Sequence, residues 1–141
     1  MKIFFTVMLF MSAIGQRVQA QDTTRKQDTV RDEPTFIKVE IEAEFPGGSG
    51  AWLHYLSKNL RYPNAAVRHN LEGTVVVQFL VDKQGKISDI QAIAGPSQDG
   101  LREEAVRLVA GSRFWVPAVQ NGRQVRSYKK VPIVFRLANN D

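Results

Sequence analysis

The chain has 141 residues, enough for one domain with a hydrophobic core and too few for two domains of ordinary size. Its apolar fraction of 43% and charged fraction of 23% are typical of a globular protein and argue against a wholly disordered chain or a bundle of membrane helices. The sequence contains no cysteine, which excludes disulfide bonds, a thiolate metal site and a cysteine nucleophile.

Residues 1–20 have the pattern of a secretory signal peptide. Lys2 precedes a mostly apolar stretch, and Val18-Gln19-Ala20 is a small-residue cleavage pattern. The apolar stretch is shorter than the roughly 18 to 20 residues that a membrane-spanning helix needs. We therefore expect cleavage and export, the alternative being an uncleaved segment that anchors the chain in the inner membrane. Cleavage removes Lys2 and Arg17 and no acid, so the formal charge falls from +5 to +3. Export and so small a positive charge argue against a nucleic-acid partner.

Residues 21–35 are predicted to form a disordered tether, because Val30 is the only large apolar residue among charges of both signs. Between residues 37 and 45 apolar and charged side chains alternate, which predicts a half-buried strand. Pro46 and the two glycines after it end this strand.

A first helix is predicted next, with Ser49 as its N-cap. Its apolar side chains recur every three or four residues and share one face: Trp52, Leu53, Leu56 and Leu60. Tyr62-Pro63 ends the helix, because proline lacks an amide hydrogen and disfavours helical angles in the residue before it. Pro63 can also open a short turn through residues 65–67.

The remaining elements follow from strand, turn and capping patterns. They are a strand at 73–82, a turn with Gly85 in the left-handed conformation, a return strand at 86–94, a helix from Leu101 to Gly111, an extended piece at 114–119, a tight turn at Asn121-Gly122 and a strand at 125–137. In the return strand the apolar residues change parity between Ile87 and Ile90, which predicts a bulge.

The order strand, helix, hairpin, helix, strand predicts an α+β fold. We expect a two-layer sandwich with two helices packed on one face of a small antiparallel sheet. The folded domain is expected to cover residues 36–138.

The residue pattern does not indicate catalysis. His54 and Ser57 lie three residues apart on the first helix, but the local pattern places no carboxylate beside them to complete a triad. His69 and Glu72 make only a weak metal pair, since no third ligand is evident. We expect no enzyme activity, no cofactor and no metal site.

Pro132 is the most informative residue of the last strand. A proline cannot donate to a ladder, so its strand belongs at a sheet edge, with that position facing away from the neighbouring strand. By parity Val134 and Arg136 share the open side. The alternate residues are expected to bond the inner neighbour and fill the core: Val131, Ile133 and Phe135. Such an edge is either merely tolerated or kept free for a partner strand.

Several short motifs occur in order along the chain. They are Phe45-Pro46-Gly47-Gly48, Trp52, Tyr55-Leu56, Asn59-Leu60-Arg61-Tyr62-Pro63, Ala66, Gly73-Thr74-Val75-Val76-Val77-Gln78-Phe79, Gly85, Trp115-Val116-Pro117-Ala118, Asn121-Gly122 and Val131-Pro132-Ile133-Val134-Phe135. Each motif is weak alone, but their spacing over roughly residues 36–137 is specific. Together they resemble the TonB carboxy-terminal domain family.

The resemblance implies a periplasmic domain that takes the TonB box, a short extended motif of outer-membrane transporters, as an added strand. It implies a partner-binding site at Val131, Pro132, Ile133, Val134, Phe135, Arg136 and Leu137, with Arg61, Tyr62 and Pro63 as flanking contacts. Family members also transmit force through an inner-membrane helix and a proline-rich spacer. Only Pro34 lies between the signal and Pro46 here, so we expect the fold and binding mode without energy transduction.

Two classes of function remain open at this point. The first is a peptide-binding module that engages TonB-dependent transporters or components of a TonB-type complex. The second is a structural or regulatory envelope protein that uses the same edge to form a homodimer. Both tryptophans, Trp52 and Trp115, are expected to pack in the core rather than contact a ligand.

Overall fold

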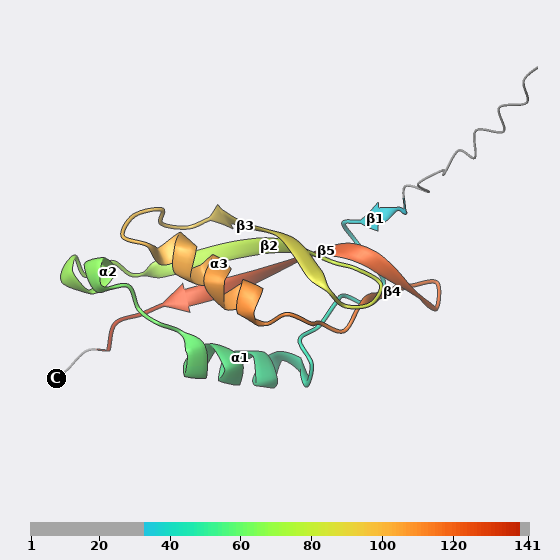
Figure 1. Cartoon of the computed structure of the whole chain (residues 1–141), viewed down its shortest axis with the longest axis horizontal. Helices are drawn as coiled ribbons and strands as arrows, with labels where there is room; N and C mark the ends of the chain where they lie inside the picture. Colours follow the sequence, from blue (N-terminus) through green and yellow to red (C-terminus); the bar gives the residue numbers. More distant parts are fainter. Residues whose placement is uncertain (1–32, 139–141) are drawn as a thin grey trace, which may run out of the picture. The chain divides into compact units, whose positions relative to one another are not determined.

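The computed structural model describes residues 33–138. The predicted signal peptide and all but the last three residues of the predicted tether lie outside the described residues. The elements, in chain order, are β1 (Thr35–Phe36), α1 (Gly48–Asn59), α2 (Asn64–Arg68), β2 (Gly73–Val81), β3 (Ile87–Ala94), α3 (Leu101–Gly111), β4 (Ala118–Gln120) and β5 (Arg123–Phe135) (Figure 1). Within this range no helix is long and apolar enough to cross a membrane.

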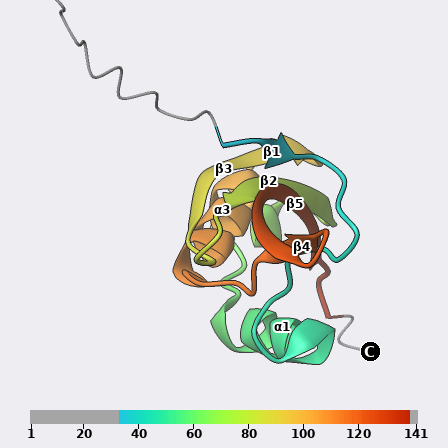
Figure 2. The same ribbon diagram turned by 90° about the vertical axis from the view of Figure 1, so that its right-hand side faces the viewer.

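The sheet is built around the antiparallel pair of β2 and β5. Their register runs without a break from Gly73 opposite Phe135 to Val81 opposite Ser127. The sheet order is β1-β5-β2-β3, and β4 forms a hairpin with the first residues of β5. Figure 2, which looks along the strands, shows β5 curling strongly at this hairpin end.

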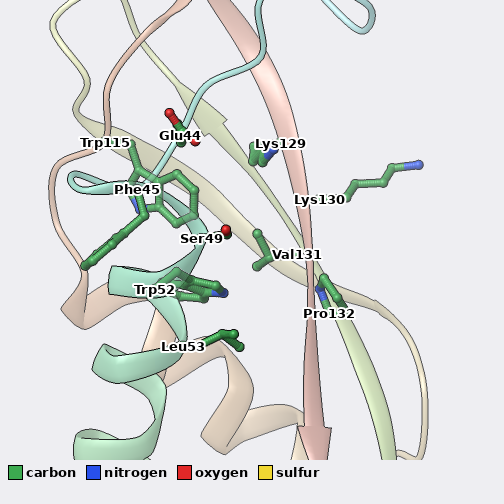
Figure 3. A pocket seen from close by; sticks show the side chains of 11 residues that line it. Glu44, Phe45, Ser49, Trp52, Leu53, Trp115, Lys129, Lys130, Val131 and Pro132 are labelled. Atoms are coloured by element: carbon green, nitrogen blue, oxygen red, sulfur yellow. The ribbon is translucent and has the colours of Figure 1, made fainter.

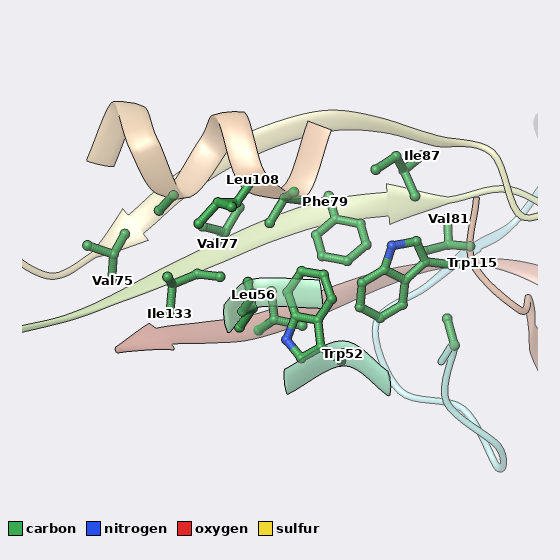
Figure 4. Packing of buried hydrophobic residues seen from close by; sticks show 14 of the residues in the cluster. Trp52, Leu56, Val75, Val77, Phe79, Val81, Ile87, Leu108, Trp115 and Ile133 are labelled. Atoms are coloured by element: carbon green, nitrogen blue, oxygen red, sulfur yellow. The ribbon is translucent and has the colours of Figure 1, made fainter. Parts of the chain in front are cut away.

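The helix-facing side of the sheet is apolar, and the opposite side is partly polar. Alternate side chains of β2 and β5 are buried on the helix-facing side: Val75, Val77, Phe79, Val81, Val131, Ile133 and Phe135. In Figure 4, Leu108 of α3 and Leu56 of α1 lie against this layer. The two-layer α+β sandwich is therefore confirmed, with a third short helix, α2, and with β1 running parallel to β5, so that the sheet is mixed.

The predicted strand at residues 37–45 is wrong. Only Thr35 and Phe36 pair as a strand, and the following segment makes just two isolated bridges, from Ile41 and Glu44. The alternation is fully borne out only at Ala43, which is buried between two exposed neighbours, whereas Ile37 and Ile41 are 85% and 60% exposed. Contacts to β5 also begin before the predicted domain boundary, at Glu33.

The first helix begins earlier than predicted. Gly47, with φ of 90°, occupies the N-cap position without a side-chain cap, so Ser49 lies inside α1 rather than capping it. The bulge predicted in the return strand is confirmed, because the register of β3 against β2 shifts between the Gln78 and Leu80 positions. Asp89 lies at this shift with φ of 51°.

A buried carboxylate joins the start of α3 to the chain that follows α1. Glu104 is 8% exposed and accepts hydrogen bonds from the backbone N–H of Arg61 at 2.8 Å and from Arg107 Nε at 2.7 Å. The Arg107 guanidinium also donates to the carbonyl of Asn59 at 2.8 Å, and its hydrogen bonds to Glu104 raise its pKa. This network fixes the segment that presents Tyr62 to the sheet.

The turn between β2 and β3 depends on a close approach of backbone to backbone. Gly85 has φ of +85°, and its carbonyl accepts the N–H of Trp115 at 2.8 Å. A Cβ added at Gly85 would lie 2.0 Å from the carbonyl oxygen of Trp115, far inside contact distance. Glycine is therefore required here by conformation and by space.

Gly85→Ala should destabilise the domain more than Gly122→Ala. Gly122 also has positive φ, of +72°, but a Cβ there meets nothing within 4 Å. Gly122→Ala should therefore lower the free energy of unfolding by about 1 kcal/mol, because alanine is strained in the left-handed conformation. Gly85→Ala should have the same strain and, in addition, a steric clash that costs about 1–3 kcal/mol. Chemical denaturation of both variants measures the difference, and equal losses would contradict the close approach.

Glu104→Ala should lower the free energy of unfolding by about 2 kcal/mol, because it leaves the Arg61 amide and the Arg107 guanidinium without their acceptor. The neighbouring exposed residue provides the control, since Glu103→Ala should cost less than about 1 kcal/mol, mainly its favourable interaction with the helix dipole. Thermal or urea unfolding compares the two. Similar losses in both variants would mean that the buried network contributes nothing specific.

Candidate functional site

The outward edge of β5 exposes backbone hydrogen-bonding groups. Pro132 pairs with Val76 and has no N–H, so this pair is of the non-hydrogen-bonded kind. Even-numbered residues of β5 therefore direct their N–H and C=O away from β2. Lys130 and Val134 offer both groups at that edge, whereas Pro132, which has no N–H, and Tyr128, whose N–H is used in the parallel pairing with β1, offer their carbonyls only.

The prediction that the last strand forms the edge of the sheet holds for most of its length but not for all. β1 pairs in parallel at Arg126 and Ser127, and the Arg126 side chain donates to Thr35 Oγ1 at 2.7 Å and to the carbonyl of Glu33 at 2.9 Å. Within the described part of the chain, no strand pairs with residues 128–135 on that side. The open edge consists of these residues.

The opposite edge of the sheet, formed by β3, is a poorer template for another strand. Its register shifts twice along β2, which interrupts the regular spacing of donors and acceptors. At its end the Arg102 guanidinium donates to the carbonyl of Gly95 at 2.7 and 3.1 Å and reaches the carbonyl of Ala92 at 3.5 Å. Bulges and charged groups of this kind discourage edge-to-edge pairing, so β5 is the edge better suited to a partner.

An apolar groove runs between α1 and the open edge of β5. It consists of two hollows that share Leu53 and Pro132. The first is lined by Glu44, Phe45, Gly48, Ser49, Trp52, Leu53, Trp115, Lys129, Lys130, Val131 and Pro132. The second is lined by Leu53, Leu56, Ser57, Leu60, Tyr62, Pro132, Val134 and Arg136. Figure 3 shows Trp52 and Leu53 projecting from α1 toward β5, with Val131 facing them.

A cluster of aromatic rings sets the position of α1 beside β5. The Trp52 ring lies 5.3 Å from Phe45, 5.4 Å from Tyr55 and 5.2 Å from Trp115, centroid to centroid. The Tyr55 hydroxyl donates to the carbonyl of Leu108 at 2.7 Å, which joins α1 to α3. Both tryptophans are therefore core residues, and Trp52 and Trp115 also form part of the groove wall.

Leu53 is the groove residue that the sequence did not identify. The helical spacing grouped it with the core residues of α1, but it is 65% exposed and lies between the two hollows. The signal was its position directly after Trp52, which turns it about 100° around the helix from the buried face. A large apolar side chain at such a position is often part of a binding surface.

The sequence-predicted site residues fall into three groups. The first group is buried and packs in the core: Val131, Ile133 and Phe135. The second group is exposed: Pro132, Val134 and Arg136. Leu137 follows the strand, and its N–H donates to Glu72 at 2.6 Å.

Only one of the three predicted flanking residues reaches this edge. Tyr62 lines the second hollow, and its ring lies edge-on to Phe135 at 5.6 Å. Arg61 and Pro63 line a different hollow, beside the start of α3, together with Glu104. The prediction that Arg61 and Pro63 contact a strand added to β5 therefore has no support in this geometry.

Basic side chains flank the open edge. Lys130 and Arg136 are exposed, whereas Lys129 donates to Glu42 at 2.8 Å and holds the pKa of that carboxyl below its ordinary value. Neither Lys130 nor Arg136 forms an ion pair within residues 33–138, so the edge carries positive charge at both ends of the groove. His69 pairs with Asp99 at 2.7 Å and not with Glu72, and within residues 33–138 no three metal-ligating side chains cluster.

Comparison with known proteins agrees with this geometry. The family model described as the Gram-negative bacterial TonB protein C-terminal matches residues 58–137. TonB of Helicobacter pylori is 28% identical over 70% of this chain, and TonB2 of Pseudomonas aeruginosa is 32% identical over 65% of it. The chain covers about a third of each relative, 34% and 33% respectively.

The solution structure of the C-terminal domain of Helicobacter pylori TonB is also similar. It is 26% identical in sequence, has a TM-score of 0.51, and aligns with 67% of this chain and 89% of its own. Residues 58–137 contain β2, β3, α3, β4 and β5, including the open edge of β5, but not β1. The chain belongs to the family of Gram-negative bacterial TonB C-terminal domains.

Proposed function

We propose that this domain binds an extended segment of a partner protein by adding it as a strand to residues 128–135 of β5. The partner is a TonB-dependent outer-membrane transporter, and binding takes place in the periplasm after export and signal cleavage. The observation that carries the proposal is the open edge of β5 lying directly beside an apolar groove. The proposal concerns binding and assigns no energy transduction to the chain.

Strand addition draws on both features of the site. Lys130 and Val134 present N–H and C=O groups in strand geometry, Tyr128 and Pro132 add their carbonyls, and each hydrogen bond gained contributes about 0.5–1.5 kcal/mol net. The groove adds burial of alternate side chains of the partner, at about 25 cal/mol per Å² of apolar surface. Backbone bonds thus give affinity, and the groove gives specificity.

A second copy of the chain is the other occupant that the same edge admits. Two β5 edges could pair antiparallel about a two-fold axis, which would make the protein a self-associating envelope component. Lys130 and Arg136 of both copies would then meet across or near the new ladder, and like charges placed opposite each other are destabilising. The repulsion favours a partner segment over self-pairing.

Val134→Pro should abolish peptide binding while leaving the domain folded. The Val134 N–H points away from β2, and its side chain is 48% exposed, so the fold should lose less than about 1 kcal/mol. Binding should weaken at least about tenfold, because the ring removes a donor and fills the space of the partner backbone. Circular dichroism and calorimetric titration with a TonB-box peptide from a transporter of the same genome measure both effects.

Two further variants control this experiment. Val134→Ala keeps the N–H and should bind nearly as tightly as the parent protein, whereas Ile133→Pro breaks a bond to β2 and should cost about 3 kcal/mol or more of stability. Mass in solution with and without the peptide distinguishes a peptide complex from a homodimer. Unchanged binding by a folded Val134→Pro variant would contradict the proposed site, and a folded, binding Ile133→Pro variant would contradict the strand parity.

A further inference from the structure

The groove beside β5 is divided. Its two hollows meet at Leu53 of α1 and Pro132 of β5, and no other residue lines both. Leu53 is 65% exposed, so its side chain stands free between the hollows rather than filling the core. A strand laid along β5 would therefore meet space, then Leu53, then space again.

The strand period decides which residues of an added segment meet these features. Directly opposite residues place their side chains on the same face of a sheet, so segment residues opposite positions 131, 133 and 135 face the helix side. Val131 lines the first hollow, and Tyr62, which packs against Phe135, lines the second. The segment residue opposite Ile133, midway between them, meets Leu53.

We infer that, given the strand addition proposed above, the groove selects a segment with a large apolar, a small and again a large apolar side chain at alternate positions. Leu53 is the residue that excludes a large side chain from the middle position. The two outer residues fill the hollows, and the intervening residues point to the opposite face, where Pro132 and Val134 are exposed.

Charge complementarity indicates what flanks this apolar pattern. The residues just beyond the two anchors lie opposite Lys130 and Arg136, both exposed on the face away from the helices. Glu42 is already bonded to Lys129, and Glu44 also lines the first hollow, so Lys130 is the first hollow's lysine without an acidic partner among the described residues. Acidic side chains at the flanking positions of the segment would therefore pair with basic groups that have room to accept them.

Three synthetic peptides test the inference, each reading the same in either direction so that strand polarity does not matter. The matched peptide is Glu-Leu-Thr-Ala-Thr-Leu-Glu, with acetyl and amide ends. The second has leucine at the centre, and the third has alanine at all three groove-facing positions. Calorimetric titration of the mature protein should rank the matched peptide about tenfold tighter than each of the others.

Leu53→Ala is the deciding variant, and its exposed position makes it safe for folding. It should remove the preference against the leucine-centred peptide or reverse it, because the barrier between the hollows is gone. His54→Ala, which is exposed beside Leu53 on α1 and lines neither hollow, should keep the parent ranking.

The outcomes separate this inference from the proposed function. Equal affinities for the first two peptides, or an unchanged ranking in Leu53→Ala, would overturn the selection by Leu53 and leave strand addition standing. Binding of a TonB-box peptide without binding of the matched peptide would do the same. Failure of every peptide, the TonB box included, would overturn both.

Discussion

The pairing of β2 with β5 is the interaction on which the rest of the structure depends. Its register from Gly73–Phe135 to Val81–Ser127 places the apolar faces of both strands together and directs them to the helices. A slip of one residue would turn every one of these side chains to solvent, so the register is strongly specified. Because Pro132 can pair only in the non-hydrogen-bonded manner, the same register also determines which backbone groups face outward.

The aromatic cluster sets the space between α1 and the sheet. Phe45, Trp52 and Trp115 fill the space at one end of the helix layer, and Phe79 of β2 lies 4.9 Å from Trp115. Large rings hold α1 through side chains, so the helix is fixed without closing over the β5 edge. The groove is a consequence of this spacing, and Leu53 enters it because α1 turns only part of its apolar surface to the core.

The sequence predicted the parts of the fold that depend on local pattern. The valine-rich run of β2, the Asn121-Gly122 turn and the parity around Pro132 each follow from strand, turn or proline chemistry, and the structure has them. The groove could not be predicted, because it depends on how far α1 stands from β5. The Lys129–Glu42 ion pair joins residues distant in sequence, and no periodicity within one element reveals such a contact. The exposure of Leu53 follows from its position on α1, but its place between the two hollows depends on β5.

The edge of β5 is open because residues 37–45 do not form a strand along it. β1 starts along that edge at Thr35, and its register would carry the next residues past Tyr128 and Lys130. Burial of Ala43 and the tilted ring contact of Phe45 with Trp52 instead hold the segment away from that edge. Its backbone bonds go to the stretch before and within β4, where Ile41 and Val119 exchange hydrogen bonds of 3.1 and 2.9 Å.

Residues 37–45 thus have the alternation of a strand and lie near the edge of β5, but Ala43 and Phe45 hold them in other contacts. Releasing it to pair with β5 would expose Ala43 and break the ring contacts of Phe45, which hold α1 in place. Such an exchange would lose these core contacts and so destabilise the fold, whereas pairing with a segment from another protein would leave them intact. Within the described part of the chain, the nearest segment, residues 37–45, is therefore held away from the edge of β5 by its own core contacts.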